Sequence, residues 1–522
     1  MSKGGFMFQQ IAAQITFSDS FPYLVTALGI TSTAGIFGWR WWKQKNTYKS
    51  LQSFPSPKRH WLLGNIPQVL AAVKEKKFFQ LLFDWSQQLG PMYVYWTGFP
   101  VLVLSKPKVI EDTIVNGMRD GSLIRSQRAS KAWNDIGGPI LLGQNGSEWQ
   151  YRRKAWNPEF SSSGLSKYVE IINQACEQII EKIQSVASPE VQVDPLFVEL
   201  TMRVISCLVL GIPVDKNIAT NEGQPLDVLK VYEAMSIVGY RFLRVATGEK
   251  IWMKYLPTKN SRDYWAARRY LEEFITPRVD LALQMREQNQ TDLTQVSPLF
   301  QESMLVKIAA KEPKYNRETL VAEVIELLIA GTDTTAHTLS FAIGELALNP
   351  RVFHQAQAVV DQVWESQGTI NGESLKELNY IRAILKETLR LYSVASGSTS
   401  LEAQRDTVIE GTVIPRGTKI YWSMLAAGRD PEVYSHPDEF LPERWLEKGK
   451  ENSQLPMIDF GSGSHRCLGE HLSMLEGTMM LALLVYYFDW ELVNGRSSLE
   501  QLQQNLLIYP PDRMPVRFRL RK

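Results

Sequence analysis

Apolar side chains recur about every 3.6 residues through most of the chain between residues 165 and 400, which is the spacing of amphipathic helices. Short runs rich in β-branched and aromatic residues predict strands at Met92–Trp96 with Val101–Leu104 and at Thr407–Ile409 with Lys419–Trp422. Gly and Pro residues punctuate both regions. The sequence shows no internal repeat or low-complexity tract. The pattern therefore predicts a mainly α fold with a small β portion.

The N-terminal part of the chain contains an uncharged, moderately apolar run of 19 residues, Phe21–Trp39. As a helix this run spans about 28 Å, close to the roughly 30 Å of a bilayer core. Indole rings favour the membrane interface, and Trp39, Trp41 and Trp42 stand at the end of the run. Four basic residues follow the run, Arg40, Lys43, Lys45 and Lys49, whereas Asp19 precedes it. The positive-inside rule then predicts a single-pass N-terminal transmembrane helix with the body of the protein on the cytoplasmic side.

Other interpretations of this segment are a cleaved signal peptide, an interfacial helix and a buried core helix. A signal peptide is disfavoured because the apolar run is long and the basic charge follows it. Pro55 and Pro57 stiffen the connection to the rest of the chain, which contains no long Gly/Ser-rich or Pro-rich linker. We therefore expect a membrane anchor over residues 1–49 and one catalytic domain over residues 50–522. In a eukaryotic cell the corresponding membrane is the endoplasmic reticulum.

Composition narrows the function by exclusion. Of the 522 residues, 44% are hydrophobic and 21% charged, as in an ordinary globular protein large enough to enclose a cofactor. The net charge is only +2 and no basic block stands out, so we expect no nucleic-acid partner. The three cysteines, Cys176, Cys207 and Cys467, lie far apart and form no CxxC pair. This spacing argues against a zinc site and against a disulfide framework.

One cysteine stands in an unusual setting. Three glycines fall within residues 460–469, and a run of leucines and methionines follows that reads as a long buried helix. Cys467 would lie near the N-terminus of this helix, where backbone N–H groups stabilise a thiolate. A thiolate in a glycine-lined turn suits the axial ligand of a heme iron. The alternative is a small buried cysteine in a glycine turn.

A second candidate lies inside the helix predicted at Val321–Leu348, which Asn349 and Pro350 end. Its middle reads Ala-Gly-Thr-Asp-Thr-Thr, and the glycine alone costs a helix about 1 kcal/mol. Residues that weaken a strong element in its centre suggest a functional site. Asp333 and Thr334 are able to hold a water and relay protons. The alternative is a Thr-rich kink packed in the core.

A third candidate is the pair Glu387 and Arg390, which meet on one helix face at a spacing of three residues. Such a pair is most often a surface ion pair of little energetic value. A second arginine on the same carboxylate, with Arg444 as the candidate, would instead make a buried structural cluster.

Together these residues resemble the cytochrome P450 family, with its Cys-loop, Ala-Gly-x-Asp-Thr-Thr and Glu-x-x-Arg motifs and a Trp-x-x-x-Arg match. The matching positions are Phe460, Gly461, Gly463, His465, Cys467 and Gly469; Ala330, Gly331, Asp333, Thr334 and Thr335; Glu387, Arg390 and Arg444; and Trp149 and Arg153. The resemblance runs from about residue 50 to the C-terminus. The predicted anchor, the proline connector and Gly428-Arg429-Asp430-Pro431 are similar to the membrane-bound branch.

The resemblance implies a monooxygenase that uses heme b and O₂ to hydroxylate or epoxidise a lipophilic substrate. Cys467 would ligate the iron, with Phe460 beside its sulfur. Trp149, Arg153 and His465 would bind the heme propionates. Asp333 and Thr334 would be catalytic and deliver protons to bound oxygen.

The resemblance also implies an electron donor. The sequence shows no dinucleotide fingerprint after a strand, so a separate reductase or ferredoxin is expected to dock near Arg466. Rival functions are a heme-thiolate isomerase or dehydratase, and a heme carrier or sensor. The intact Asp333–Thr334 pair favours the monooxygenase.

The chain departs from the family pattern just after the Glu-x-x-Arg helix. A further propionate-binding arginine is usual there, but residues 396–401 read Ser-Gly-Ser-Thr-Ser-Leu, and the usual Pro-rich turn is absent. We expect Trp149, Arg153 and His465 to carry the propionates, with Thr399 in place of the missing arginine. The alternative is that Arg405 or a water network supplies the contact. The sequence does not identify the substrate, whose pocket is expected at residues 121–139, 232–242, 327–335, 394–401 and 509–510.

Overall fold

The computed structural model describes residues 46–186, 190–214, 228–247, 249–287, 296–395, 400–446 and 455–521. The predicted anchor helix, Phe21–Trp39, lies outside these ranges, as does Thr399. Within the ranges, no helix combines the length and the apolar character that a membrane crossing needs.

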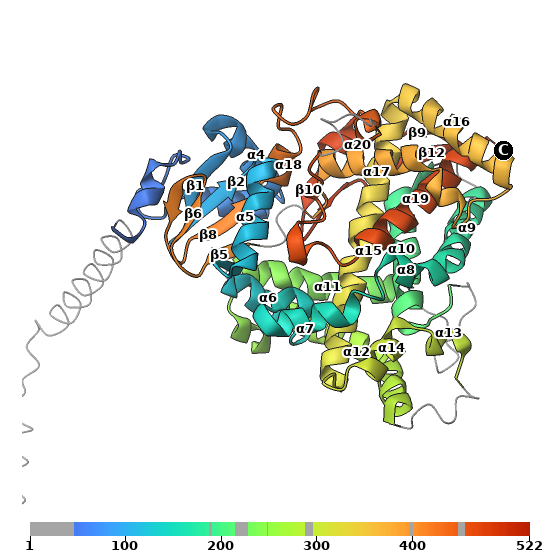
Figure 1. The fold of residues 1–522 in the computed structure, drawn as a ribbon, viewed down its shortest axis with the longest axis horizontal. Coiled ribbons are helices and arrows are strands. Elements are labelled where there is room, and N and C mark those ends of the chain that lie inside the picture. Colours follow the sequence, from blue (N-terminus) through green and yellow to red (C-terminus); the bar gives the residue numbers. More distant parts are fainter. Residues whose placement is uncertain are drawn as a thin grey trace, which may run out of the picture.

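Helices make up most of the molecule, as the 3.6-residue spacing predicts (Figure 1). The α-helices are α3 (Ile66–Lys74), α4 (Phe78–Leu89), α5 (Pro107–Arg119), α6 (Gln127–Gly137), α7 (Gly146–Trp156), α8 (Ser162–Leu165), α9 (Val169–Ser185), α10 (Val193–Leu210), α11 (Val228–Thr247), α12 (Lys259–Glu287), α13 (Pro298–Gln301), α14 (Met304–Lys311), α15 (Arg317–Leu348), α16 (Pro350–Gln367), α17 (Asn379–Tyr392), α18 (Met424–Ala427), α19 (Glu470–Tyr487) and α20 (Ser497–Glu500).

In the described part of the chain the strands are short, and they form one five-stranded sheet and three smaller sheets. They are β1 (Met92–Trp96), β2 (Pro100–Leu104), β3 (Leu123–Arg125), β4 (Glu190–Gln192), β5 (Leu401–Ala403), β6 (Thr407–Ile409), β7 (Thr412–Ile414), β8 (Lys419–Trp422), β9 (Phe488–Leu492), β10 (Gln503–Gln504), β11 (Ile508–Tyr509) and β12 (Pro515–Leu520). The five-stranded sheet has the order β1-β2-β8-β5-β3, and β12 lies between β4 and β9 in the three-stranded sheet.

The predicted strands are confirmed as strands, but one predicted pairing is wrong. β1 pairs with β2 in antiparallel register, Met92 opposite Leu104. β6, however, pairs with the adjacent β7 across a tight turn at Glu410 and Gly411, both with positive φ. β8 instead joins the five-stranded sheet, parallel to β2 and antiparallel to β5. The close turn favours the local partner because it leaves no loop to order.

The five-stranded sheet and its helices form one end of the molecule (Figure 1). Alternate residues of β1 and β2 face opposite sides: Val94 and Leu102 pack with α5, whereas Tyr93 and Val103 pack with Trp85 of α4. Burial on both faces explains why β2 reads as a continuous apolar run. The sheet is therefore packed against helices on both faces, α5 on one and α4 on the other.

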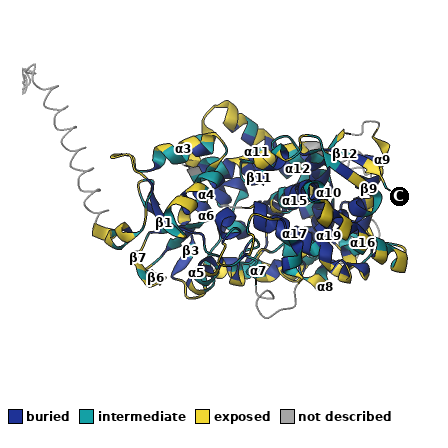
Figure 2. Ribbon diagram, turned by 90° about the horizontal axis from the view of Figure 1, so that it is seen from above, coloured by how far each residue is buried: buried dark blue, intermediate teal, exposed yellow. Residues whose placement is uncertain are grey.

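Helix α15 runs through the helical body as its central element, and most of its residues are buried (Figures 1 and 2). It ends at Leu348, as predicted, because Asn349 and Pro350 begin the next helix. It starts four residues earlier than predicted, where the side chain of Asn316 accepts a hydrogen bond from the N–H of Thr319. Within the polar segment of α15, Thr332 and Thr335 are buried, whereas Gly331, Asp333 and Thr334 are half-buried and Ala330 is exposed.

Candidate functional site

The Cys467 loop is a closed turn just before α19. The N–H of Cys467 donates to the carbonyl of Phe460 at 2.6 Å, and the N–H of Gly461 donates to Ile458 at 2.8 Å. Gly461 and Gly463 have φ of 74° and 64°, a left-handed backbone that favours glycine. The structure confirms the predicted position of the cysteine ahead of a long helix, with Phe460 joined to it through the backbone.

The chemistry of the Cys467 thiol is a balance of opposing effects. The side chain has accessible surface, yet the protein around it removes enough water to raise its pKa. The N–H of Gly469 and the charge of Arg153 act in the opposite direction. The sequence suggested that the N-terminus of α19 stabilises a thiolate at Cys467, but this effect alone does not outweigh burial. A bound metal cation would, because a coordinating thiol gives up its proton.

Beside the cysteine lies a cationic cluster, which we define as Arg125, Trp149, Arg153 and His465. The rings of Trp149 and His465 stack with centroids 3.6 Å apart, and Arg153 is one turn along α7 from Trp149. Burial, and then the charges of Arg125 and Arg153, lower the pKa of His465 to about 3. His465 is consequently neutral at physiological pH, and its ring keeps one N–H that is able to donate a hydrogen bond.

The cationic cluster suits a ligand with negative charge. Two guanidinium groups close together repel one another, and burial and the charge of Arg153 help to lower the pKa of Arg125 to about 10. Nδ1 of His465 and Nε of Arg153 are buried and have no hydrogen-bond partner. Heme propionates carry two negative charges and accept hydrogen bonds, so the cluster fits a heme whose iron lies at Cys467.

Arg125 is the residue that the sequence analysis missed. It lies on β3, opposite Leu401 of β5, and therefore beside the segment where the family's usual arginine is absent. Its guanidinium donates to the carbonyls of Leu141 and Gln144, both at 3.0 Å. Arg405, the alternative that the sequence offered, instead pairs with Asp120 and is 59% exposed. The sequence did not predict this residue, because a single arginine in a three-residue strand belongs to no motif that would mark it as part of the site.

The polar segment of α15 is held by its own helix and by neighbouring helices. The hydroxyl of Thr334 donates to the carbonyl of Ala330 at 2.8 Å, and that of Thr335 donates to Ser473 of α19 at 2.9 Å. A Cβ on Gly331 would come within 3.2 Å of Ile205 on α10. The space that this glycine provides therefore admits α10, which supports a packing role for Gly331 within the motif.

Asp333 differs from its neighbours because part of its carboxylate is free. Burial raises the pKa of Asp333, against the opposing effects of His337 and of a hydrogen bond with Tyr232. Its Oδ1 atom is buried without a hydrogen-bond partner. A carboxyl group with a raised pKa and one unpaired oxygen is suited to take up and release a proton. No hydrogen bond or ion pair of the described residues links Asp333 or Thr334 with Cys467.

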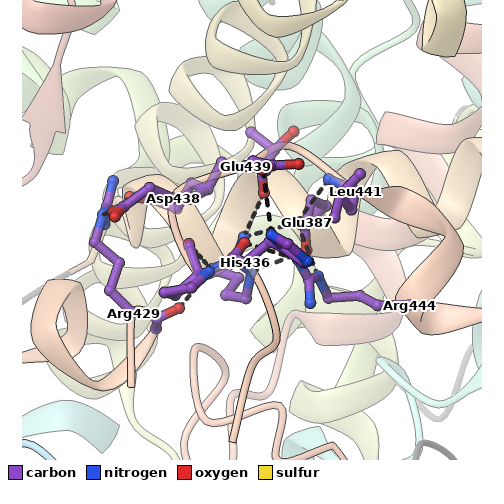
Figure 3. Close-up of polar contacts among 12 residues, drawn as sticks. Glu387, Arg429, His436, Asp438, Glu439, Leu441 and Arg444 are labelled. Carbon is purple, nitrogen blue, oxygen red and sulfur yellow. Dashed lines mark hydrogen bonds and ion pairs between the residues drawn. The ribbon is translucent and has the colours of Figure 1, made fainter. Parts of the chain in front are cut away.

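The Glu387 cluster is the buried alternative that the sequence left open (Figure 3). The carboxylate of Glu387 is 0% exposed and accepts two hydrogen bonds from Arg390, at 2.7 and 2.9 Å. Arg444 donates to the same carboxylate at 3.1 Å. The indole of Trp445 and the N–H of Leu441, each at 2.9 Å, complete the set. The cluster fixes α17 to the segment that ends in η6 (Pro442–Trp445).

Two cavities lie near the segments predicted as substrate-pocket walls. The larger, about 400 Å³, has a largely apolar lining from α3, α11 and the five-stranded sheet, and includes Ser126, Ala129, Phe242 and Ser400. The smaller, about 330 Å³, lies against α15 and includes Tyr232, Asp333 and Tyr509. Residues from 121–139 and 232–242 line these cavities, and among the described residues of 394–401, which exclude 396–399, Ser400 does so.

Comparisons with known proteins agree with this geometry. Residues 54–518 match the sequence model of the family described as Cytochrome P450. The chain is 27% identical to Cytochrome P450 71D8 of Glycine max over 90% of this chain and 92% of the relative. It is 28% identical to Cytochrome P450 71A1 of Persea americana over 82% and 84% of the two chains. It is 25% identical to 2-hydroxyisoflavanone synthase of Glycyrrhiza echinata over 80% and 81%.

Proposed function

Since the chain belongs to the cytochrome P450 family, we propose that Cys467 is the residue that ligates the iron of its heme. The protein is a heme-thiolate monooxygenase that uses heme b and O₂, inserts one oxygen atom into a lipophilic organic compound, and takes electrons from a separate redox partner. The observation that carries the assignment to Cys467 is its place beside the buried cationic cluster, which suits heme propionates.

The residues of the cationic cluster have distinct roles in this proposal. Arg125 and Arg153 pair with the propionates, and Trp149 and His465 donate uncharged hydrogen bonds from one stacked unit. Phe460 holds the cysteine through its carbonyl. Bound heme supplies the redox chemistry, in which O₂, two electrons and two protons yield one inserted oxygen atom and one water.

Heme retention tests the cationic cluster. Arg125→Ala and Arg153→Ala are each expected to release heme to a scavenging apoprotein about 10- to 100-fold faster than the wild type. Each change removes a charge-assisted contact worth about 1.5–3 kcal/mol. Arg405→Ala is the control and should release heme at the wild-type rate, because Arg405 pairs with Asp120 at the surface. Wild-type retention in Arg153→Ala would discard the propionate role.

We assign the proton chemistry to Asp333 and Thr334. Asp333 exchanges protons, since its carboxyl has a raised pKa and a free Oδ1. The Thr334 hydroxyl bonds only its own helix, to Ala330, so it is able to rotate toward a bound water.

Coupling of oxygen use to product tests this pair. Thr334→Ala is expected to keep consuming O₂ but to lower product per NADPH by about tenfold, with the difference appearing as hydrogen peroxide, and Asp333→Asn should slow turnover. Thr338→Ala is a matched control, because its hydroxyl only bonds the carbonyl of Thr334. An unchanged product yield in Thr334→Ala would remove Thr334 from the mechanism.

We also propose that Phe21–Trp39 anchors the chain in a membrane, with the catalytic domain over residues 50–522 on the cytoplasmic side. Exposed aromatic side chains next to a basic one support contact of the domain with a bilayer. Trp252 is 60% exposed and Tyr255 is 70% exposed, and Lys254 lies between them in the sequence. The larger cavity, with its apolar lining, would take a lipophilic substrate from such a surface.

Extraction of the full chain tests the anchor. The wild type should remain in the membrane pellet after alkaline carbonate washing, whereas a variant that lacks residues 21–39 should be released into the supernatant. Protease added to sealed vesicles should digest the catalytic domain from the cytoplasmic side. Retention of the deletion variant after carbonate washing would place the anchor elsewhere in the chain.

A further inference from the structure

A second cluster of ionisable side chains surrounds Asp333 and shares no residue with the cationic cluster. It occupies the wall of the 330 Å³ cavity between α11, α15 and the C-terminal loop. The titratable residues that line this cavity are Lys76, Tyr232, Tyr240, Asp333, His337, Tyr509 and Arg513. None of these residues except Asp333 has a part in the function described above.

At the base of the cluster is Asp194, in the first turn of α10 and 0% exposed. Its Oδ1 contacts Nδ1 of His337 at 2.6 Å and accepts from Ser340 at 3.1 Å. Its Oδ2 accepts from Arg513 at 3.0 Å. Burial alone would raise the pKa of Asp194, but His337 and Arg513 outweigh it and lower the pKa. Asp194 is therefore negatively charged, and His337 contacts this charge directly.

The charge of His337 follows from this contact. Burial lowers the pKa of the imidazole, but Asp194 and then Asp333 raise it by more, so the net pKa lies above that of an ordinary histidine. Arg513 opposes this shift in part. With Nδ1 bonded to Asp194, Nε2 is the ring nitrogen available to the cavity. The imidazolium thus persists to higher pH than in a free histidine, and its second proton is the one able to leave.

Asp333 lies one turn before His337 on the same helix, and both line the cavity. The hydroxyl of Tyr232, on α11, bonds the Asp333 carboxyl and also interacts with Arg513. The Oδ1 of Asp333 stays without a partner. One end of the polar lining is therefore the carboxyl group that exchanges protons in the proposed function.

The other end of the lining reaches the protein surface. Tyr240 on the rim is 49% exposed, and the Arg513 side chain is 42% exposed. Nζ of Lys76 donates to the hydroxyl of Tyr509 at 3.0 Å, and that hydroxyl donates to Gln503 at 2.9 Å. The rings of Tyr509 and His337 have centroids 6.1 Å apart. Polar groups thus extend from the surface to His337.

We propose that this cavity is the path by which solvent protons reach Asp333, and that His337, whose Nδ1 contacts Asp194, is the positioning residue that returns a proton to Asp333. The inference rests on the proposed role of Asp333. The overall reaction, RH + O₂ + 2 e⁻ + 2 H⁺ → ROH + H₂O, consumes two protons per turnover. Each passes from Nε2 of His337 to the Asp333 carboxyl, and solvent in the cavity returns a proton to His337.

The test compares two ways of driving the heme-loaded, full-length enzyme. His337→Gln keeps a side-chain amide that is able to donate to Asp194 but cannot carry the proton. With the redox partner and NADPH, this variant should turn over roughly tenfold to a hundredfold more slowly than the wild type, with a larger solvent isotope effect. With hydrogen peroxide as oxidant, RH + H₂O₂ → ROH + H₂O consumes no proton, so its rate should match the wild type.

The outcomes separate the inference from the function on which it rests. A His337→Gln variant slowed equally with both oxidants has only a structural defect, and a variant slowed with neither is not on the proton path; either result overturns the inference. If Asp333→Asn also leaves the NADPH-driven rate unchanged, the proposed role of Asp333 fails as well. If Asp333→Asn is slow while His337→Gln is normal, only the inference fails.

A measurement independent of activity completes the test. The chain has six histidines, so selective ¹³C labelling together with the His337→Gln spectrum assigns the His337 resonance by NMR. Its titration midpoint should lie above the ordinary value of about 6.5, and Asp194→Asn should lower it. A midpoint at or below the ordinary value in the wild type would contradict a cationic His337.

Discussion

Cys467→Ala is expected to abolish monooxygenase activity and the thiolate-type band in the carbon monoxide difference spectrum, while the chain still folds. The reason is that Cys467 is the sulfur beside the cationic cluster, and α19 begins only after it, at Glu470. Alanine fills less space than cysteine and leaves the bond between the backbone of residue 467 and Phe460 possible. The loss should therefore concern the iron ligand and little else.

The measurement is the reduced carbon monoxide difference spectrum, together with the heme content of the purified variant. Cys176→Ala is the matched control, because Cys176 is buried in α9 and burial raises its pKa well above that of a free thiol. It should keep the thiolate-type band. Survival of that band in Cys467→Ala would show that another residue ligates the iron.

Glu387→Gln is expected to be the most destabilising of the single substitutions considered. The change keeps the size of the side chain but removes the negative charge that two buried arginines, Arg390 and Arg444, share. Removing one partner from a buried ion pair typically costs about 3–5 kcal/mol, because the charge that remains is no longer compensated. We expect most of the variant to be recovered without heme.

A urea unfolding midpoint and the ratio of heme to protein measure this effect. Glu432→Gln is the control: Glu432 is 70% exposed and pairs with Lys106 at the surface, so its loss should leave the midpoint nearly unchanged. A wild-type midpoint and full heme content in Glu387→Gln would mean that Arg390 and Arg444 are held by their backbone contacts, such as Arg390 with Gly428, rather than by the carboxylate.

For the Glu387–Arg390 pair, the sequence predicted the contact but not whether the pair is buried. Glu387 and Arg390 are three residues apart, so their contact follows from helix geometry, but only the fold makes the pair buried. Arg444 is 57 residues from Glu387 and joins it only because η6 packs against α17. The difference matters for stability. Removing one partner from a surface ion pair changes the free energy of unfolding little, whereas removing one partner from a buried pair leaves an uncompensated charge and destabilises the protein strongly.

By itself the sequence determined the features that local spacing controls. The apolar period determined the helices, Asn349 and Pro350 determined the end of α15, and the glycines determined the turn before Cys467. Only the tertiary structure decided the partner of β8, the role of Arg125 next to Leu401, and the contact of Asp194 with His337, 143 residues away. The physical reason is that backbone conformation depends on neighbours within a few residues, whereas burial and charge pairing depend on which distant segments pack together.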